Sequence, residues 1–160
     1  LKEYVKLNGL HKHVEFVINP TDVDEYYKQA DIYLSTSIYE GLSNSIMEAM
    51  SFNLPVIATK VGDNDKLIEH NKTGYLVNPK EVNEISKCIS LLIYNDELRN
   101  EFGLKGYFHL KANFSMDKFA ISHIKLIEEL KSKAQTKSSR HWSKKISRLI
   151  YDLLPRTLNR

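Results

Sequence analysis

The first half of the chain alternates between short apolar stretches and segments whose apolar residues recur every three or four positions. Short alternating or nearly continuous apolar stretches predict β-strands, and the longer spacing predicts helices. The expected strands are 14–18, 31–36, 55–59 and 75–77, and the expected helices between them are 21–30, 43–52 and 64–70. Strands that alternate with helices are typical of a parallel sheet covered by helices, which binds ligands beyond the carboxyl ends of its strands. We therefore expect an α/β fold.

From Glu81 onward the pattern is helical throughout. Apolar residues of the first helix recur on one face, namely Val82, Ile85, Cys88, Ile89 and Leu92. Asp96 is a suitable N-cap for a second helix that runs through about Lys111, and Ser115 is one for a third. The Ser- and Lys-rich stretch 131–140 that follows predicts a linker.

A basic amphipathic pattern occupies the tail, residues 141–160. Its apolar residues recur at helical spacing: Trp142, Ile146, Leu149, Ile150, Leu153 and Leu154. Arg and Lys residues surround this stripe, which leaves two interpretations open. Residues 141–156 either pack on another part of the protein or another subunit, or they contact an anionic membrane.

Composition places the chain among ordinary globular proteins. Its 160 residues are enough for one domain with a core, and they are 42% hydrophobic and 27% charged. The net charge of +3, with tyrosines that basic residues do not interleave, argues against nucleic acid as a partner. No apolar run approaches the roughly 18 residues of a membrane span, and no signal peptide is recognisable. The expected compartment is the cytoplasm.

Motifs of several other protein classes are absent from the sequence. The single cysteine, Cys88, rules out an internal disulfide framework and a cysteine-based zinc site. The six histidines show no metal-ligand spacing, so no metal site is expected. Neither a P-loop motif nor a G-x-G-x-x-G motif occurs, which argues against a P-loop nucleotidase or a simple NAD-binding protein.

Two glutamates eight residues apart, Glu40 and Glu48, frame the junction between a predicted strand and a predicted helix. Ser43, Asn44 and Ser45 all favour the start of a helix, and free N–H groups at such a start bind phosphate well. If the stretch were all helix, the two glutamates would lie about 12 Å apart, roughly the reach from a sugar across a diphosphate to a ribose. Because carboxylates accept hydrogen bonds from hydroxyls, the pattern predicts a nucleotide-sugar site.

The residues around this junction resemble those of retaining glycosyltransferases of family 4. Glu40-x7-Glu48 is followed by Ala49-Met50, then by the stretches 54–59, 61–64 and 71–77, which continue the match. The resemblance covers about residues 1–130. It implies the GT-B fold, in which two Rossmann-like domains face each other across a cleft. This chain would supply the C-terminal, nucleotide-sugar-binding domain, with a partial parallel sheet flanked by helices and followed by C-terminal helices.

The resemblance also implies a role for each residue of the junction. Glu40 would be catalytic, bonding the 3- or 4-hydroxyl of the donor sugar and stabilising positive charge on its ring in the transition state. Glu48 would accept the ribose hydroxyls. The diphosphate would rest on the backbone amides of Gly41, Leu42, Ser43, Asn44 and Ser45, although this chain lacks the second glycine that many members carry near Ser43. Gly62, with Asp63, would border the nucleotide or acceptor, or else form an ordinary turn.

The implied activity is transfer of a hexose from a UDP- or GDP-sugar to a hydroxyl acceptor with retention and without a bound metal. The implied acceptor is a saccharide or lipid-linked saccharide of cell-surface polysaccharide synthesis, which together with the basic tail suggests the inner face of the plasma membrane. Two alternatives stay open: a non-catalytic nucleotide-binding or membrane-tethered interaction module, and a hydrolase or phosphorylase that shares the fold.

Leu1 stands inside an amphipathic helical pattern, residues 1–7, so we expect the chain to be a fragment of a longer protein. In the family, an N-terminal domain and the first part of the C-terminal domain would precede it. The basic side chains that stabilise the leaving diphosphate normally lie in that upstream part. We therefore expect the 160 residues alone to be inactive.

Overall fold

The computed structural model describes residues 1–135, and the side chains of residues 1–133. Strands and helices alternate in the first half of the chain and helices follow, as predicted. In chain order the elements are α1 (Lys2–Leu7), η1 (Leu10–Lys12), α2 (Asp24–Gln29), β1 (Tyr33–Ser35), α3 (Asn44–Ser51), β2 (Val56–Thr59), α4 (Asn64–Leu67), β3 (Gly74–Val77), α5 (Val82–Ile93), α6 (Asp96–Phe114) and α7 (Met116–Gln135). The predicted tail, 141–160, lies outside the described residues.

The sheet consists of three parallel strands in the order β1-β2-β3. Val56 in the central strand β2 pairs with Tyr33 of β1 and with Gly74 of β3. All four residues of β2 are buried, as the nearly continuous apolar run of this strand predicts. Since the strands are parallel, their carboxyl ends share one edge, from which the loops into α3 and α4 leave.

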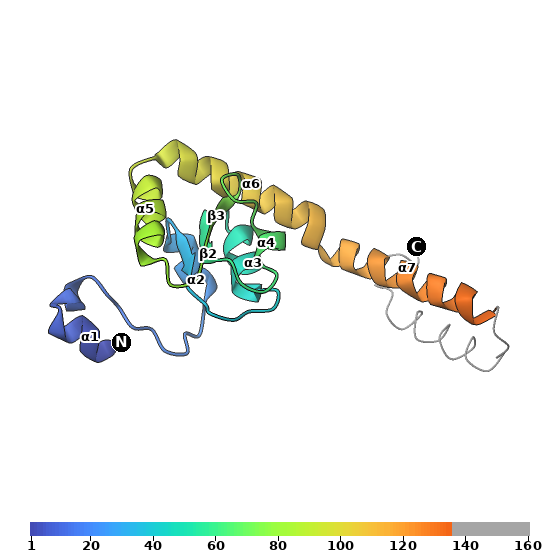
Figure 1. The fold of residues 1–160 in the computed structure, drawn as a ribbon, viewed down its shortest axis with the longest axis horizontal. Coiled ribbons are helices and arrows are strands. Elements are labelled where there is room, and N and C mark those ends of the chain that lie inside the picture. The colour runs from blue at the N-terminus through green and yellow to red at the C-terminus, as the bar shows by residue number, and fades with distance from the viewer. Residues whose placement is uncertain (136–160) are drawn as a thin grey trace.

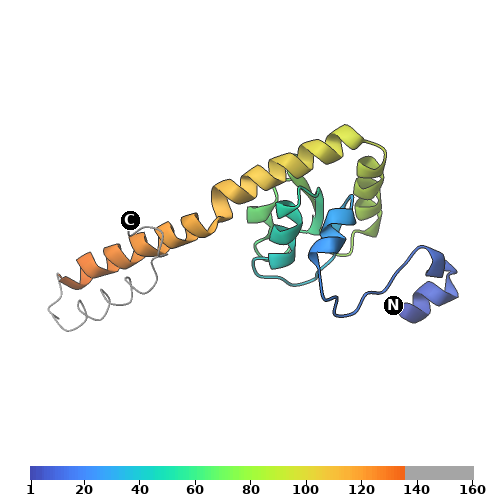
Figure 2. The same cartoon turned by 180° about the vertical axis from the view of Figure 1, so that it is seen from behind.

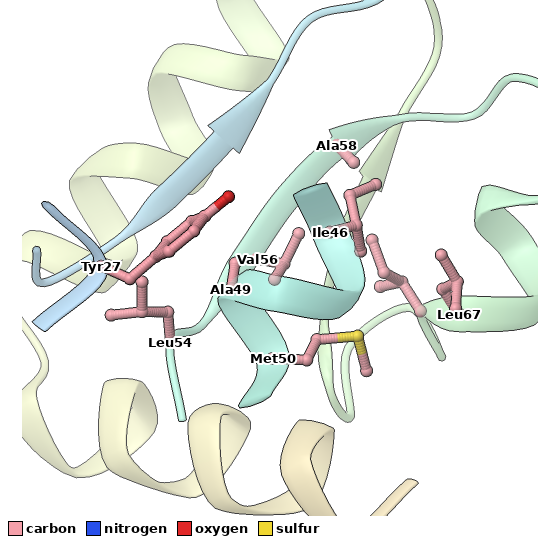
Figure 3. Close-up of a cluster of buried hydrophobic side chains, with 9 residues drawn as sticks. Tyr27, Ile46, Ala49, Met50, Leu54, Val56, Ala58 and Leu67 are labelled. Atoms are coloured by element: carbon pink, nitrogen blue, oxygen red, sulfur yellow. The ribbon is translucent and has the colours of Figure 1, made fainter. Parts of the chain in front are cut away.

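Helices cover both faces of the sheet (Figures 1 and 2). Val56 and Ala58 of β2 face one layer, where they share a buried cluster with Ile46 of α3. Figure 3 shows these side chains converging between the strand and the helix. Ile57 faces the opposite layer and clusters with Leu92 of α5. The two-residue alternation of β2 therefore divides the core into two parts, one on each face of the sheet.

The helix α6 packs against both α3 and α5. Its Gly103 lies so close to the backbone of Asn53 that an added Cβ would overlap the Asn53 carbonyl oxygen. The following helix, α7, extends away from the sheet (Figures 1 and 2). Several of its apolar side chains are exposed, namely Met116, Phe119, Ile121, Leu126 and Leu130. Among the described residues, no helix combines the length and the apolar character needed to cross a membrane.

The prediction of a strand at 14–18 is wrong. These residues pair with no strand in the described part of the chain, and the sheet begins at β1. Val14, Phe16 and Val17 keep 37–41% of their surface exposed, so the alternating pattern is not matched by burial on one face. A strand needs the hydrogen-bond ladder of a neighbour, and alternation in the sequence does not report whether that neighbour is present.

Several helix boundaries also differ from the predictions. Helix α2 begins at Asp24 rather than at residue 21. Helix α4 ends at Leu67 rather than at residue 70, because Ile68 is extended and His70 forms a bridge with Gly74. The N-cap of α6 is Asn95 rather than Asp96, and its side chain accepts a hydrogen bond from the Leu98 amide. Helix α7 continues through Gln135, so the first half of the predicted linker 131–140 is helical.

Candidate functional site

Two loops meet at the carboxyl edge of the sheet. Residues 36–43 lead from β1 into α3, and residues 60–63 lead from β2 into α4. The Asp63 amide donates a hydrogen bond of 3.2 Å to the Gly41 carbonyl. Gly62, whose φ is +54°, packs so tightly that an added Cβ would overlap the carbonyl oxygen of Glu40. Gly62 therefore lies directly against the loop that carries Glu40.

The Glu40 side chain is half-buried and held at one oxygen. Ser37 donates its hydroxyl to Glu40 Oε1 over 2.7 Å. Ser37 is held in turn, because Thr59 at the end of β2 donates its own hydroxyl to the Ser37 carbonyl. No described residue donates to the second oxygen, Glu40 Oε2. The carboxylate is thus oriented by the protein and keeps one oxygen available to a ligand.

The N-terminus of α3, which follows Glu40 along the chain, presents unbonded amides. Met47 is the first residue of the helix whose amide is hydrogen-bonded, and it donates to the Ser43 carbonyl. Within the described residues, the amides of Asn44, Ser45 and Ile46 have no acceptor. The Ser43 hydroxyl contacts the Ser45 hydroxyl at 3.2 Å and does not cap the helix. In α6, by contrast, the side chain of the N-cap residue satisfies such an amide.

Glu48 lies on α3, four residues beyond the first residue of the helix, and its side chain is exposed. The Tyr27 hydroxyl donates to Glu48 Oε2 over 3.0 Å and also approaches the Ser45 carbonyl at 3.4 Å. No described residue donates to Glu48 Oε1. This carboxylate, like that of Glu40, is fixed at one oxygen and free at the other.

The remaining predicted residues surround the start of α3. Gly41, Leu42 and Asn44 are exposed, whereas Ser43 is buried. Asp63 forms an ion pair of 2.9 Å with Lys66 and so points its charge along α4. The structure therefore brings together Glu40, the loop 41–45 and Gly62. Among the described residues, no cluster of three or more His, Cys, Asp or Glu side chains has a geometry suited to a metal ion.

Sequence reasoning missed the hydroxyl groups that hold the two carboxylates. Tyr27 falls within the predicted helix 21–30, but nothing in the sequence paired it with Glu48. Ser37 stands three residues before Glu40, a spacing common in loops without any such contact. Thr59 is predicted only as the last residue of a strand. These contacts join segments about 20 residues apart and are visible only in the folded chain.

Burial, and then the hydrogen bond to Glu48, raise the pKa of Tyr27 above its usual value. The folded protein thus holds this proton more tightly than the unfolded chain, so the resulting stability is complete below about pH 10 and is lost as the pH rises further. We expect the free energy of unfolding of the full-length protein to fall above pH 10, with up to about 1.4 kcal/mol per pH unit due to Tyr27.

Tyr27→Phe should remove that part of the slope, as measured by urea denaturation between pH 8 and pH 11.5. Burial also raises the pKa values of Tyr75 and Cys88. Both groups remain in the variant, so their contributions cancel in the comparison. Equal slopes for the wild type and Tyr27→Phe would contradict the assignment of the proton to Tyr27.

Comparison with known proteins identifies the class to which this fold belongs. The model of the glycosyl transferases group 1 family matches residues 1–108. The chain belongs to this family. Its parallel sheet flanked by helices is the fold of the C-terminal domains of GT-B glycosyltransferases, as in the crystal structure of that domain of the group 1 protein LpcC from Francisella tularensis. The two share 30% identity with a TM-score of 0.64, over 72% of this chain and 60% of the other.

Curated relatives point to the same class. An uncharacterized glycosyltransferase from Haemophilus influenzae is 36% identical over 99 residues, which cover 61% of this chain and 28% of that protein. The poly(ribitol-phosphate) alpha-N-acetylglucosaminyltransferase of Staphylococcus aureus is 39% identical over 88 residues, 54% of this chain and 18% of that protein. The chain thus spans less than a third of the length of either relative.

A further solved structure includes bound nucleotide. A variant of S. aureus TarM, in complex with Fondaparinux, alpha-GlcNAc-glycerol and UDP, matches with a TM-score of 0.73 and 29% identity. The match covers 78% of this chain and 26% of the TarM chain. A protein that is similar to most of this chain therefore binds UDP.

Proposed function

We propose that this chain is the nucleotide-sugar-binding domain of a retaining hexosyltransferase of family 4. The observation that carries the proposal is the row of unbonded amides at the start of α3, with Glu40 before it and Glu48 behind it. A diphosphate is stabilised by such amides and by the helix dipole, and the hydroxyls of a sugar and a ribose need acceptors. Glu40, the amides and Glu48 thus follow the order of sugar, diphosphate and ribose in a nucleotide-sugar.

The nucleotide half of the donor lies along α3. The amides of Asn44, Ser45 and Ile46 bind the diphosphate, and the exposed Gly41 lets the phosphate approach the backbone closely. Glu48 follows about 6 Å further along the helix axis. Its free oxygen Oε1 accepts hydrogen bonds from the ribose hydroxyls.

The sugar half of the donor lies toward Glu40. Its free oxygen Oε2 accepts a hydrogen bond from a ring hydroxyl, the 3- or 4-hydroxyl of the hexose. As the bond to the diphosphate breaks, positive charge develops on the sugar ring, and a fixed carboxylate nearby stabilises that charge more in the transition state than in the ground state. At the same time the amides of α3 stabilise the negative charge of the leaving diphosphate, so we propose that no bound metal is required. Turnover should then persist in EDTA.

The donor is a UDP- or GDP-sugar, and the acceptor is a saccharide or lipid-linked saccharide of cell-surface polysaccharide synthesis. The family, the UDP bound to TarM and the poly(ribitol-phosphate) named as the substrate of the S. aureus relative support this assignment. We place the enzyme in the cytoplasm at the inner face of the plasma membrane, where the basic residues of the tail sequence would meet anionic lipid. Retention would be seen directly in the anomeric configuration of the product by NMR.

A thermal-shift screen of the full-length protein against UDP-, GDP- and ADP-sugars tests the proposal. A ligand that binds only the folded state at 100 times its Kd adds about 2.7 kcal/mol to the free energy of unfolding. We expect one of the UDP- or GDP-sugars to raise the midpoint by several degrees, and Glu48→Ala to reduce that shift. No shift with any of the three donors would contradict the proposal.

The 160 residues alone are expected to show no sugar transfer. The candidate site is open, with Leu42 and Asn44 exposed beside it. In this account the acceptor-binding site and the second wall of the cleft are formed by another domain. The measurement is incubation of the isolated chain with the donor and acceptor that the full-length enzyme uses. Product formed at more than background rate would refute the requirement for a second domain.

A further inference from the structure

The hydroxyl of Tyr27 is the one described donor to the Glu48 carboxylate. It contacts Oε2 at 3.0 Å, while Oε1 has no partner among the described residues. Glu48 is otherwise exposed on α3, and an exposed glutamate without a partner samples several rotamers. The contact with Tyr27 therefore selects one orientation of the carboxylate.

Tyr27 is well suited to hold another side chain in place, because its own ring is fixed. It is 8% exposed and belongs to the cluster between α3 and the sheet. The ring stacks on Phe52 at a centroid distance of 5.5 Å and tilts against Tyr33 at 5.9 Å. Figure 3 shows it beside Ala49 and Leu54. A buried ring with two aromatic neighbours loses little further entropy when its hydroxyl binds.

The direction of the hydrogen bond is also fixed. A carboxylate only accepts hydrogen bonds, so the phenol must donate. Burial raises the pKa of Tyr27, which keeps the phenol protonated at every pH at which the protein would work. The hydroxyl also lies 3.4 Å from the Ser45 carbonyl, in the first turn of α3, but its single proton goes to the closer Glu48 oxygen.

We propose that Tyr27 is a positioning residue for nucleotide recognition: it holds Glu48 so that the free carboxylate oxygen meets the ribose hydroxyls. This inference rests on the proposed function and adds to it the residue that sets selectivity for a ribose bearing both hydroxyls. Tyr27 contacts the nucleotide only through Glu48. Its loss should therefore weaken nucleotide binding and leave the chemical step at Glu40 unchanged.

The test compares two nucleotides in the full-length protein by calorimetry. They are UDP (or GDP, where the donor screen selects it) and the 2′,3′-dideoxy analogue of the same nucleotide. Tyr27→Phe keeps the ring and removes only the hydroxyl. It is expected to weaken binding of the normal nucleotide about 3- to 10-fold, as for loss of one hydrogen bond to a charged group. Binding of the dideoxy nucleotide should change less than about 2-fold, because it has no hydroxyl for Glu48.

Tyr33→Phe is the matched control, since it removes the same hydroxyl from the neighbouring ring, which has no described contact with Glu48. It should bind both nucleotides as the wild type does. In a Glu48→Ala background, Tyr27→Phe should cause no further loss, because the two residues act as one unit. The kcat of Tyr27→Phe at saturating donor should stay within about 2-fold of the wild type, whereas its KM for donor rises.

Other results would overturn the inference. If Tyr27→Phe weakens both nucleotides equally, or adds its full effect to Glu48→Ala, Tyr27 acts on the fold and not through Glu48. If Tyr27→Phe does not fold, the same two nucleotides are compared in Glu48→Asp. The shorter side chain cannot contact both the Tyr27 hydroxyl and the ribose, so an unchanged preference for the normal over the dideoxy nucleotide would overturn the proposal. If Glu48→Ala leaves nucleotide affinity unchanged, both the proposed function of Glu48 and this inference fail.

Discussion

Glu40→Gln in the full-length protein is expected to lower kcat about 10²- to 10³-fold while changing the affinity for UDP or GDP less than about 3-fold. Glutamine has nearly the same shape as glutamate, but it carries no charge to stabilise a positive sugar ring. The nucleotide is bound by α3 and Glu48, so its affinity depends little on Glu40. Steady-state kinetics and calorimetry on the same preparation measure the two quantities.

Glu128→Gln is a suitable control, because it makes the same change at an exposed position of α7 away from the candidate site. It should leave both kcat and affinity unchanged. If Glu40→Gln altered only the nucleotide affinity and the protein transferred no sugar, a non-catalytic nucleotide-binding module would explain the site better. Products formed without any acceptor would instead favour a hydrolase.

Gly62→Ala is expected to destabilise the protein by at least about 2 kcal/mol and to reduce activity with it. Two independent effects add at this position. The φ of +54° is unfavourable for alanine, and the new Cβ would overlap the carbonyl oxygen of Glu40. Relief of that overlap must move the loop that carries Glu40, so kcat should fall even where the variant remains folded. Urea denaturation and steady-state kinetics provide the two measurements.

Gly41→Ala gives the opposite expectation and so serves as a comparison. At Gly41 the φ lies outside the left-handed region and no heavy atom stands within 4 Å of an added Cβ. Its stability should match the wild type within about 0.5 kcal/mol, but its nucleotide affinity should fall, because the methyl group obstructs the approach of the diphosphate. Equal destabilisation by Gly41→Ala and Gly62→Ala would contradict the loop packing described above.

The sequence predicted those parts of the fold that depend on local patterns. The apolar run of β2 and the N-cap residues before α3 were sufficient to place a strand and a helix, and both are confirmed. The prediction of a strand at 14–18 was wrong because an alternating pattern carries no information about a pairing partner. The predicted length of α4 was wrong because His70 pairs with Gly74 in a bridge and so cannot be helical.

The candidate site divides in the same way. Glu40, the first amides of α3 and Glu48 follow one another along the chain, so their order could be predicted, although Glu40 lies in the loop before α3 and only Glu48 is placed by helix geometry. The partner of Glu48, Tyr27, comes from α2, about 20 residues away. Ser37, the partner of Glu40, is in the same loop, but it is held by Thr59 at the end of β2. The sequence also left Gly62 open to interpretation as an ordinary turn, since only the folded chain shows its contact with the Glu40 carbonyl. Tertiary contacts of this kind have no signature in a single sequence.

A crystal structure of the full-length protein with UDP or GDP bound is the most direct test of the central claim. The account predicts the diphosphate within hydrogen-bonding distance of the amides of Asn44, Ser45 and Ile46, with the ribose hydroxyls on Glu48 and the terminal phosphate toward Glu40. A nucleotide bound elsewhere, with these amides and both carboxylates left in contact with solvent, would contradict it.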